Sequence, residues 1–296
     1  MALTDRVKIW IEAMRLRTLP VSVAGVLTAV GMAMAAGKFR WLTAVICLLF
    51  AVLAQIASNF GNEYFDFRDG LDKKGRVGPR RGVTEGDITP RGMLFATIAT
   101  LAVASLLGLT LIIWGGWWLV AAGVAIVLGA LAYSAGPYPL SRHGWGEVAV
   151  VLFFGVAPVT LTYYLQTGGC TWQVWLASIA MGLLGANVLV VNNYRDMEED
   201  RAVGKKTLAV RFGERFATGL YITDGIIAWP LLNVAWHDYD WPSDLSIFVV
   251  LGTAMLYNQL KRTTGRALNP YLGKTSMLMF ATSLIILGYG IAVYFF

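Results

Sequence analysis

The stretch NFGNEYFDFRDGLDKKGRVGPRRG, residues 59–82, decides how this chain is organised. An apolar run at residues 41–58 leads into it and is long enough to cross a bilayer as a helix. Acidic and amide side chains come first in the stretch, and cations follow them: Asn62, Glu63, Asp66, Asp69 and Asp72, then Lys73, Lys74, Arg76, Arg80 and Arg81. Taken alone, acidic and basic residues at the end of a membrane helix are typical of a solvated loop.

A second stretch repeats this plan. An apolar run at residues 172–191 leads into Asn192, Asn193, Asp196, Glu198, Glu199 and Asp200, and then into Lys205 and Lys206. Asn62 and Asn192 stand 130 residues apart, and so do Asp66 and Asp196. Two membrane helices that end in the same order of groups predict one shared site for a metal-bound polyanion.

The composition is that of an integral membrane protein, because 57% of the residues are hydrophobic and only 14% are charged. No polar or Gly/Ser/Pro-rich linker divides the chain, so residues 1–296 are expected to form a single membrane domain. The net charge of +6 does not indicate nucleic-acid binding, because the basic residues lie in short loops between apolar runs, where they set topology. The oligomeric state is left open.

Nine apolar runs predict nine transmembrane helices, near residues 19–37, 41–60, 92–114, 117–134, 147–165, 172–191, 217–236, 245–260 and 275–296. With this division, all but two of the 24 Lys and Arg residues fall on one side of the membrane, and only Lys38 and Arg40 fall on the other. Positive residues favour the cytoplasmic side. The pattern therefore predicts a multi-pass protein of the cytoplasmic (inner) membrane, with its N-terminus and both polar segments in the cytoplasm and its C-terminus outside.

The second and sixth predicted helices run in the same direction, because an even number of crossings separates them. Their matching ends indicate an internal duplication, with helices one to four related to helices five to eight and a ninth helix appended.

Helical spacing predicts which polar side chains converge. Residues four apart share one helix face, so Asn192, Asp196 and Asp200 are expected to point toward one object, as are Asn62 and Asp66. The next position on the first of these faces is Gly70, which has no side chain. We expect the helix to end near Gly70 and the chain to turn, returning Asp72 toward the site. Whether Asp69 or Asp72 completes the first set stays open.

Clustered carboxylates repel one another unless a cation neutralises them, and Mg²⁺ binds through carboxylates together with substrate phosphates. The two segments therefore predict two Mg²⁺ ions that bridge to a diphosphate. Arg81, Lys205 and Arg17 are candidates to hold the outer phosphate oxygens. A substrate with a phosphorylated head at the cytoplasmic face and a lipid tail between helices fits this arrangement.

At these residues the sequence resembles the UbiA superfamily of intramembrane aromatic prenyltransferases. The first superfamily motif, NDxxDxxxD, is matched here by Asn62, Glu63 and Asp66, with Gly70 in place of the last aspartate. This departure looks like the menaquinone branch of the superfamily, which prenylates 1,4-dihydroxy-2-naphthoate. Three further stretches carry the same resemblance: RTLP at Arg17–Pro20, GPRRG at Gly78–Gly82, and NNYRDMEEDRAVGKKTLAVRFG at Asn192–Gly213.

The resemblance implies an all-α bundle of nine transmembrane helices around a central cavity that opens laterally to lipid. It implies Mg²⁺-dependent transfer of a polyprenyl group from polyprenyl diphosphate to 1,4-dihydroxy-2-naphthoate, with loss of CO₂ and diphosphate, on the way to menaquinone. The catalytic residues would be Asp66, Asp72, Asp196 and Asp200, which with Asn62 would also hold the metal. The substrate-binding residues would be Arg17, Asn62, Arg81, Tyr133, Asn192 and Lys205, although Pro137 replaces the lysine of the superfamily's YxxxK pattern after Tyr133.

Two alternatives remain at this stage. A prenyltransferase of the same superfamily with another acceptor, such as 4-hydroxybenzoate or homogentisate, would have a similar metal site. A cation-coupled transporter is a different class of protein, favoured only by Asp224, an ionisable residue well inside a predicted membrane helix.

Overall fold

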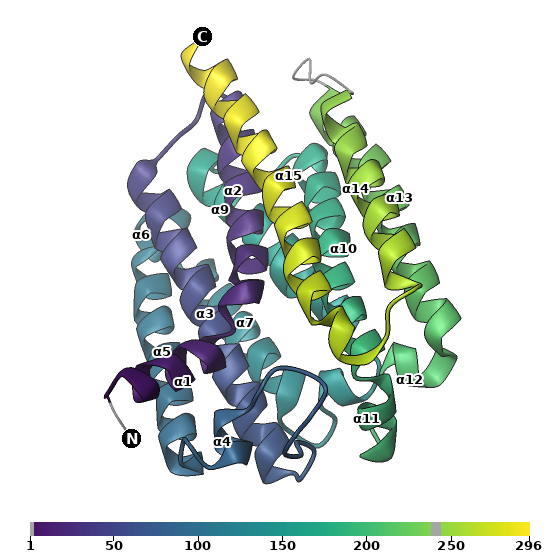
Figure 1. Cartoon of the computed structure of the whole chain (residues 1–296). Helices are drawn as coiled ribbons and strands as arrows, with labels where there is room; N and C mark the ends of the chain where they lie inside the picture. The colour runs from purple at the N-terminus through teal and green to yellow at the C-terminus, as the bar shows by residue number, and fades with distance from the viewer. Residues whose placement is uncertain (1–2, 238–243) are drawn as a thin grey trace.

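The computed structural model describes residues 3–237 and 244–296. Within these ranges the chain is helical and contains no strand, so the predicted all-α class is confirmed. Most of the long helices run between the two ends of the molecule, and α1 crosses the lower end at an angle to them (Figure 1). The elements in order are α1 Leu3–Met14, the short 3₁₀ helix η1 Leu16–Thr18, α2 Leu19–Ala35, α3 Trp41–Arg68, α4 Gly82–Glu85, α5 Pro90–Thr110, α6 Ile112–Gly115, α7 Trp118–Ser134, η2 Leu140–Arg142, α8 Gly146–Val150, the π-helix η3 Val151–Val156, α9 Ala157–Thr167, α10 Trp172–Arg195, α11 Met197–Ala202, α12 Leu208–Phe212, α13 Glu214–Trp236, α14 Asp244–Leu260, η5 Gly265–Leu268 and α15 Asn269–Phe295.

Six helical stretches in the described residues are long and apolar enough to cross a membrane: Asp5–Ala35, Trp41–Arg68, Pro90–Gly115, Gly146–Thr167, Trp172–Arg195 and Gly265–Phe295. Two shorter apolar helices lie at Trp118–Ser134 and Ser246–Leu260. The protein is therefore a multi-pass membrane protein. Each of the nine predicted apolar runs falls largely on helix, but the count of nine crossings and the direction of the termini stay predictions.

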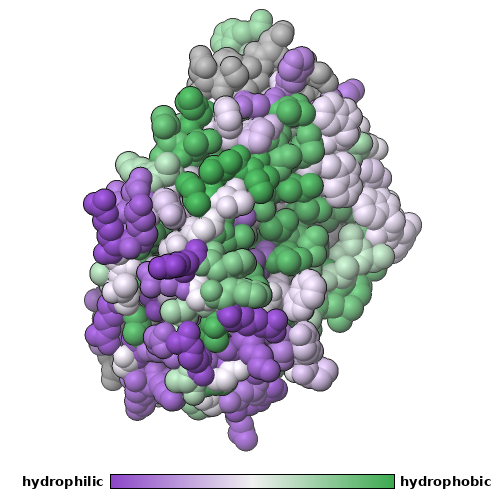
Figure 2. Space-filling view, turned by 90° about the vertical axis from the view of Figure 1, so that its right-hand side faces the viewer, coloured by the Kyte–Doolittle hydropathy of each residue, from purple (hydrophilic) through white to green (hydrophobic). Residues whose placement is uncertain are grey.

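The outer surface has the polarity that a membrane requires. Figure 2 shows hydrophobic side chains over the middle and upper part of one face, and hydrophilic side chains gathered at its lower end. This lower end carries α4, α11 and the loop that follows α3 (Figure 1). The polar segments of the sequence thus lie together at one end of the bundle.

Small residues let the central helices approach closely. The α-carbon of Gly290 in α15 faces the backbone of Gly31 in α2, and a Cβ atom added at Gly290 would collide with the Gly31 carbonyl oxygen. Gly155 and Gly182 make a similar contact between η3 and α10. Such contacts are typical of helices that pack inside a membrane. These contacts tie α15 to α2 and α10 to η3.

Candidate active site

The end of α3 has the geometry that was predicted from Gly70. The helix ends at Arg68, and Gly70 adopts φ +70°. The backbone N–H of Gly70 donates to the carbonyl of Phe67 at 3.0 Å, and that of Leu71 donates to the carbonyl of Asp66 at 2.8 Å. These two bonds are the Schellman pattern, which needs a left-handed residue at the position of Gly70. The predicted helix end is confirmed.

The second polar segment keeps its helical register across a short break. α10 ends at Arg195 and α11 begins at Met197. The backbone N–H of Asp196 still donates to the backbone carbonyl of Asn192 at 3.0 Å. The N–H of Asp200 likewise donates to the carbonyl of Asp196 at 2.8 Å. Because this helical hydrogen bonding continues, the side chains of Asn192, Asp196 and Asp200 stay near one helix face, as predicted.

A polar cavity of about 170 Å³ lies between the ends of α3 and α10. Eight of the ten residues predicted for the site line it: Asn62, Asp66, Arg81, Tyr133, Asn192, Asp196, Asp200 and Lys205. The two segments, 130 residues apart in sequence, thus contribute to one cavity. Asp72 and Arg17 are the two predicted residues that are not part of its lining.

Lys205 joins the two segments electrostatically. Its Nζ lies 3.4 Å from Asp66 Oδ2 and 3.4 Å from Asp200 Oδ1. Burial alone would lower the pKa of Lys205, but the carboxylates of Asp66 and Asp200 outweigh burial and raise it. Asp66 also faces Arg142, whose guanidinium lies 3.4 Å away. Lys205 is therefore a fixed positive charge between the carboxylates of both segments.

Arg76 makes the second link between the segments, and the sequence analysis did not single it out as a site residue. Its guanidinium lies 3.0 Å from Asp72 and 3.0 Å from Asp196. The side chain of Asp72 is only 4% exposed, and its carboxylate also lies 3.3 Å from Arg81. Asp72 therefore returns toward the site as expected, but it reaches Asp196 only through Arg76 and does not itself line the cavity.

Asp69 has a different environment from Asp72. Its carboxylate pairs with Arg68 at 2.7 Å and with Arg142 at 2.6 Å, and 27% of the side chain is exposed. The side chain of Asp72 is only 4% exposed. Of the two candidates left open by the sequence, Asp72 therefore has the more buried side chain, and Arg76 links it to Asp196.

Arg15, and not Arg17, points into the cavity. Arg17 is exposed, whereas the Arg15 guanidinium donates to Asn62 Oδ1 at 2.8 Å. Arg15 adopts a left-handed conformation, φ 55° and ψ 54°, between α1 and η1. This conformation is uncommon for a residue with a side chain. The turn at Arg15 directs the side chain of Arg15, and not that of Arg17, toward the cavity. Helical periodicity does not predict such a turn.

Burial also shifts two carboxylates at the site. It raises the pKa of Asp72 to about 6, although Arg76 opposes the shift. It raises the pKa of Asp200 to about 6, opposed mainly by Lys205. Desolvation disfavours the charged form of a carboxylate, so both groups take up a proton at a higher pH than an exposed aspartate does.

The donors around the cavity suit Mg²⁺ in chemical type. Carboxylate and amide oxygens are the hard ligands that this ion prefers, and those of Asp66, Asp196, Asp200, Asn62 and Asn192 line the same cavity. Within residues 3–237 and 244–296, however, no three carboxylate, imidazole or thiol groups lie together as a preformed metal site. The cations of Arg76 and Lys205 stand between the carboxylates instead.

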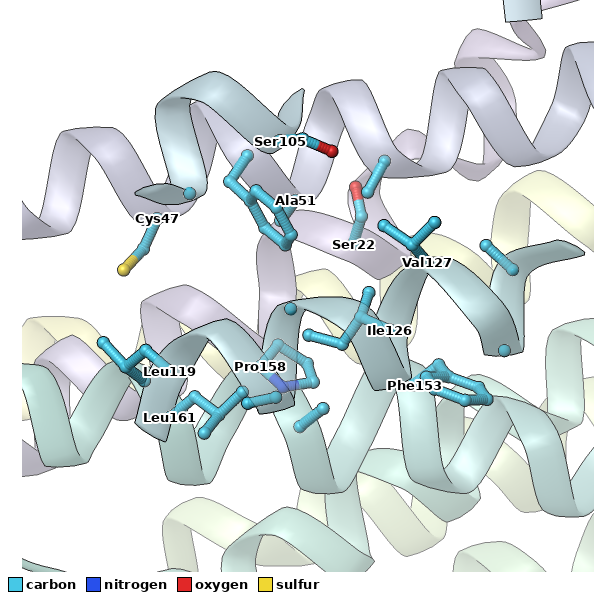
Figure 3. Close-up of a pocket in the computed structure, with 18 of the residues that line it drawn as sticks. Ser22, Cys47, Ala51, Ser105, Leu119, Ile126, Val127, Phe153, Pro158 and Leu161 are labelled. Carbon is cyan, nitrogen blue, oxygen red and sulfur yellow. The ribbon is translucent and has the colours of Figure 1, made fainter. Parts of the chain in front are cut away.

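A second, apolar cavity of about 440 Å³ continues from the polar one into the bundle. Figure 3 shows side chains around it from α2, α3, α5, α7 and η3, among them Ser22, Cys47, Ser105, Ile126 and Phe153. Five residues line both cavities: Gln55, Ser58, Tyr133, Val150 and Phe154. We call these five residues the neck. A polar compartment for a charged head thus joins an apolar compartment for a hydrocarbon tail.

The UbiA prenyltransferase family model matches residues 24–284, which is most of the chain and includes both polar segments. The chain belongs to the UbiA prenyltransferase family. It is therefore an enzyme of prenyl transfer, and the resemblance inferred from the two motifs is confirmed.

Curated UbiA-family relatives are similar over about seven tenths of their length. A 1,4-dihydroxy-2-naphthoate octaprenyltransferase of Mycobacterium tuberculosis is 38% identical over 219 residues, 74% of each chain. The proteins of the same name from Escherichia coli and Haemophilus influenzae are 37% and 35% identical, and the matches cover 71% of this chain and 70% and 71% of theirs.

Solved structures share the UbiA fold at low sequence identity. A UbiA homologue from Archaeoglobus fulgidus bound to DMAPP and Mg²⁺ aligns with a TM-score of 0.69 and 17% identity, covering 97% of this chain and 99% of that one. The apo UbiA homologue from Aeropyrum pernix aligns with a TM-score of 0.67 and 16% identity, over 96% and 98% of the two chains. At this identity the likeness shows the fold alone.

The ionisable residue that favoured transport lies apart from the UbiA-family site. Asp224 is buried in α13 and lines neither cavity.

Glu147 of α8 supports the second polar segment, because it accepts a hydrogen bond from Asn193 of α10 at 2.9 Å. Asn193 follows Asn192 directly, so Glu147 helps to position the second polar segment.

Proposed function

We propose that this protein transfers a polyprenyl group from polyprenyl diphosphate to 1,4-dihydroxy-2-naphthoate, in a Mg²⁺-dependent reaction that releases diphosphate and CO₂. The observation that carries the proposal is the neck, where a cavity lined by both polar segments meets an apolar cavity. An allylic diphosphate has the same division into a charged head and a hydrocarbon tail. The bond that breaks lies between these two parts, and therefore at the neck.

The names of similar curated relatives indicate the aromatic substrate that accepts the prenyl group. Proteins from Haemophilus influenzae, Mycobacterium tuberculosis, Escherichia coli and Bacillus subtilis, at 32–38% identity, are all named 1,4-dihydroxy-2-naphthoate octaprenyltransferases. A 2-carboxy-1,4-naphthoquinone phytyltransferase of Synechocystis is more distant, at 28% identity. The naphthoate acceptor is therefore better supported than 4-hydroxybenzoate or homogentisate.

The polar cavity favours departure of the diphosphate. Arg15 and Arg81 both donate to Asn62 Oδ1, at 2.8 Å and 3.0 Å, so their guanidinium groups converge on one point of the cavity wall. Together with Lys205 they would hold phosphate oxygens and stabilise the charge that the leaving group gains. Asn62, Asp66, Asp72, Asp196 and Asp200 would hold Mg²⁺, which supplies further neutralising charge when bound.

The neck suits the carbon centre left behind. When the C1–O bond breaks, its electron pair leaves with the diphosphate, and C1 becomes an allylic cation. The rings of Tyr133 and Phe154 line the neck, and aromatic faces stabilise a nearby cation. The ring carbon that bears the carboxylate then attacks C1. Loss of CO₂ returns its bonding electron pair to the ring, so the product is a prenylated naphthalenediol and no oxidant is needed.

The proposal includes a membrane orientation. The polar cavity would face the cytoplasm, the tail of the polyprenyl substrate would lie among membrane lipid, and nine crossings would place the C-terminus on the far side. The clustering of positive residues in the predicted cytoplasmic loops supports this direction. The single domain built from two related four-helix units belongs to the same proposal.

The decisive experiment uses the purified protein in nanodiscs with polyprenyl diphosphate and Mg²⁺. Parallel reactions contain 1,4-dihydroxy-2-naphthoate or 4-hydroxybenzoate, and release of diphosphate and CO₂ is measured in each. Release of both with the naphthoate alone is expected. Diphosphate release with only the benzoate would change the acceptor, and no release with either would contradict the proposed reaction.

A further inference from the structure

Gln55 is a polar residue deep in the apolar part of α3. It precedes Asn62 by seven residues, which is about two helical turns and about 10 Å along the axis. Seven residues return to nearly the same face, so Gln55 lies above Asn62 and Asp66 on one stripe of the helix. Gln55 is 6% exposed and lines both cavities.

The orientation of the Gln55 amide is fixed by η1. Gln55 Nε2 donates to the carbonyl oxygen of Thr18 at 3.0 Å and to Thr18 Oγ1 at 3.3 Å. A carbonyl oxygen can only accept, so the NH₂ group must face Thr18 and Oε1 must face the other way. The Thr18 hydroxyl donates to the carbonyl of Arg15 at 3.0 Å, which leaves its oxygen free to accept from Gln55.

Gln55 Oε1 is buried and accepts no hydrogen bond from any residue that the structure describes. Buried polar atoms are nearly always hydrogen-bonded, because an unpaired acceptor in apolar surroundings is costly. Of the other four neck residues, Val150 and Phe154 are apolar, and the hydroxyl groups of Ser58 and Tyr133 do not hydrogen-bond to Oε1. Gln55 Oε1 is thus a hydrogen-bond acceptor held in a fixed direction at the neck. It is suited to a ligand that brings an O–H or N–H donor.

We propose that Gln55 Oε1 accepts a hydrogen bond from a ring hydroxyl of the aromatic acceptor, which makes the neck the acceptor subsite and Gln55 its specificity-determining residue. This inference rests on the proposed function. Of the two substrates, only the dihydroxynaphthoate carries a donor at neutral pH. The prenyl tail is hydrocarbon, and the diphosphate and carboxylate oxygens are acceptors.

The bond would also orient the nucleophile. Gln55 lies on the same face as the residues proposed to hold the diphosphate, about two turns deeper. A ring anchored by its hydroxyl at Gln55 would lie in the neck, beside the C1 atom of the prenyl group. Accepting a hydrogen bond from the hydroxyl leaves more electron density on the ring, which favours attack by carbon.

The test compares acceptor analogues in wild-type and variant proteins. Inhibition constants are measured for 1-hydroxy-2-naphthoate and 4-hydroxy-2-naphthoate, each of which lacks one hydroxyl, together with the KM of the full substrate. In the wild type, one of the analogues is expected to bind about tenfold more weakly than the full substrate, since one hydrogen bond of about 1.4 kcal/mol corresponds to that factor. In Gln55→Met the difference is expected to vanish, while the KM for polyprenyl diphosphate stays unchanged.

Gln166→Met is the matched control. Gln166 is another buried glutamine of the membrane helices, but both ends of its amide are engaged by Arg40, at 2.6 Å and 3.2 Å, and it lines neither cavity. This variant is expected to bind the weaker analogue about tenfold less tightly than the full substrate, as the wild type does. If Gln55→Met does not fold, Gln55→Asn shortens the side chain by one methylene and is expected to remove the discrimination in the same way.

The outcomes separate this inference from the proposed function. A wild-type protein that prenylates the naphthoate, together with Gln55 variants that keep the tenfold discrimination, would overturn the role of Gln55 alone. In that case a bound water would satisfy Oε1. A wild-type protein that does not prenylate the naphthoate would overturn the proposed function itself.

Discussion

The guanidinium of Arg76 lies 3.0 Å from the carboxylate of Asp196 and joins the loop after α3 to the end of α10. The same guanidinium lies 3.0 Å from Asp72. Two buried carboxylates from different segments thus share one cation. Arg76 neutralises part of the charge of these carboxylates, and a bound cation would take over part of this role.

Arg76→Gln tests that relationship. Without Mg²⁺ the variant removes one of two guanidinium partners from each carboxylate, since Asp72 keeps Arg81 and Asp196 keeps Arg195, so we expect it to lose about 2 kcal/mol of stability. This is less than the 3–5 kcal/mol of a fully buried pair, because the Arg76 side chain is 14% exposed. We expect the thermal midpoint in detergent to fall by about 5 °C in EDTA, and Mg²⁺ to restore much of the loss.

The control for this prediction is Arg201→Gln. Arg201 pairs with Glu198 at 2.6 Å, but the two side chains are 49% and 73% exposed. Exposed pairs contribute little to stability, so the midpoint should not move and should not depend on Mg²⁺. Equal behaviour of the Arg76 and Arg201 variants would contradict the bridging role of Arg76.

Asp66→Ala and Asp196→Ala should each abolish turnover. Both carboxylates line the polar cavity, and each comes from a different segment. Loss of either should lower Mg²⁺ and diphosphate binding and reduce kcat/KM by at least about 100-fold. Diphosphate release measured over a range of Mg²⁺ concentrations checks this. Near-normal turnover of either variant at saturating Mg²⁺ would contradict the metal assignment.

Much of the site could be predicted because helical periodicity fixes which side chains share a face. The spacing of Asn192, Asp196 and Asp200 was sufficient to place all three on one cavity. Gly70 was informative for a related reason, since a residue without a side chain at the end of a helix indicates a left-handed cap.

The residues that the sequence analysis missed depend on contacts without a local pattern. Arg76 reaches Asp196 across 120 residues from an irregular loop. Arg15 replaces Arg17 because one left-handed residue shifts the register of the basic segment. Gln55 had a detectable signal, since it is a polar residue in an apolar run on the same face as Asn62, but periodicity does not show that its acceptor is unpaired.

The position that completes the first segment can be tested at Gly70. Gly70 has φ +70°, so an added side chain is strained there by about 1–2 kcal/mol even though the space around it is open. Gly70→Asp should therefore lower stability and should not raise activity. Gly70→Ala carries similar strain without charge and is the control. Higher turnover in Gly70→Asp than in the wild type would mean that Asp72 lies outside the metal shell.

Asp72→Ala and Asp69→Ala should differ strongly. The Asp72 side chain is buried and linked through Arg76 to Asp196, whereas Asp69 is partly exposed and pairs with Arg68 and Arg142. We expect Asp72→Ala to raise the Mg²⁺ concentration needed for half-maximal turnover at least tenfold, and Asp69→Ala to change it less than threefold. If Asp69→Ala raises the Mg²⁺ requirement more than Asp72→Ala does, then Asp69 completes the metal-binding set of the first segment.

Acidification should weaken Mg²⁺ binding. Burial raises the pKa of Asp72 and Asp200 to about 6, so both carboxylates are mostly ionised at pH 7 and mostly protonated at pH 5. Mg²⁺ must displace these protons, so its apparent affinity should fall about tenfold for each group between pH 7 and pH 5. Calorimetric titration with Mg²⁺ at both pH values measures the change. Asp72→Asn should reduce the pH dependence, and an affinity that does not change below pH 6 would contradict the prediction.

The apolar cavity should set how long a prenyl tail the enzyme accepts. Gly123 of α7 lines this cavity, and a Cβ atom added there would meet nothing within 4 Å, so a larger side chain would extend into the space for the tail. Gly123→Phe should therefore lower kcat/KM at least tenfold for an octaprenyl diphosphate and much less for geranyl diphosphate. Gly219→Phe is the matched control, because Gly219 lies on α13 with equally open surroundings and lines neither cavity. If both variants change the preference equally, the effect comes from altered helix packing. If Gly123→Phe leaves the long-chain reaction unchanged, the tail lies elsewhere.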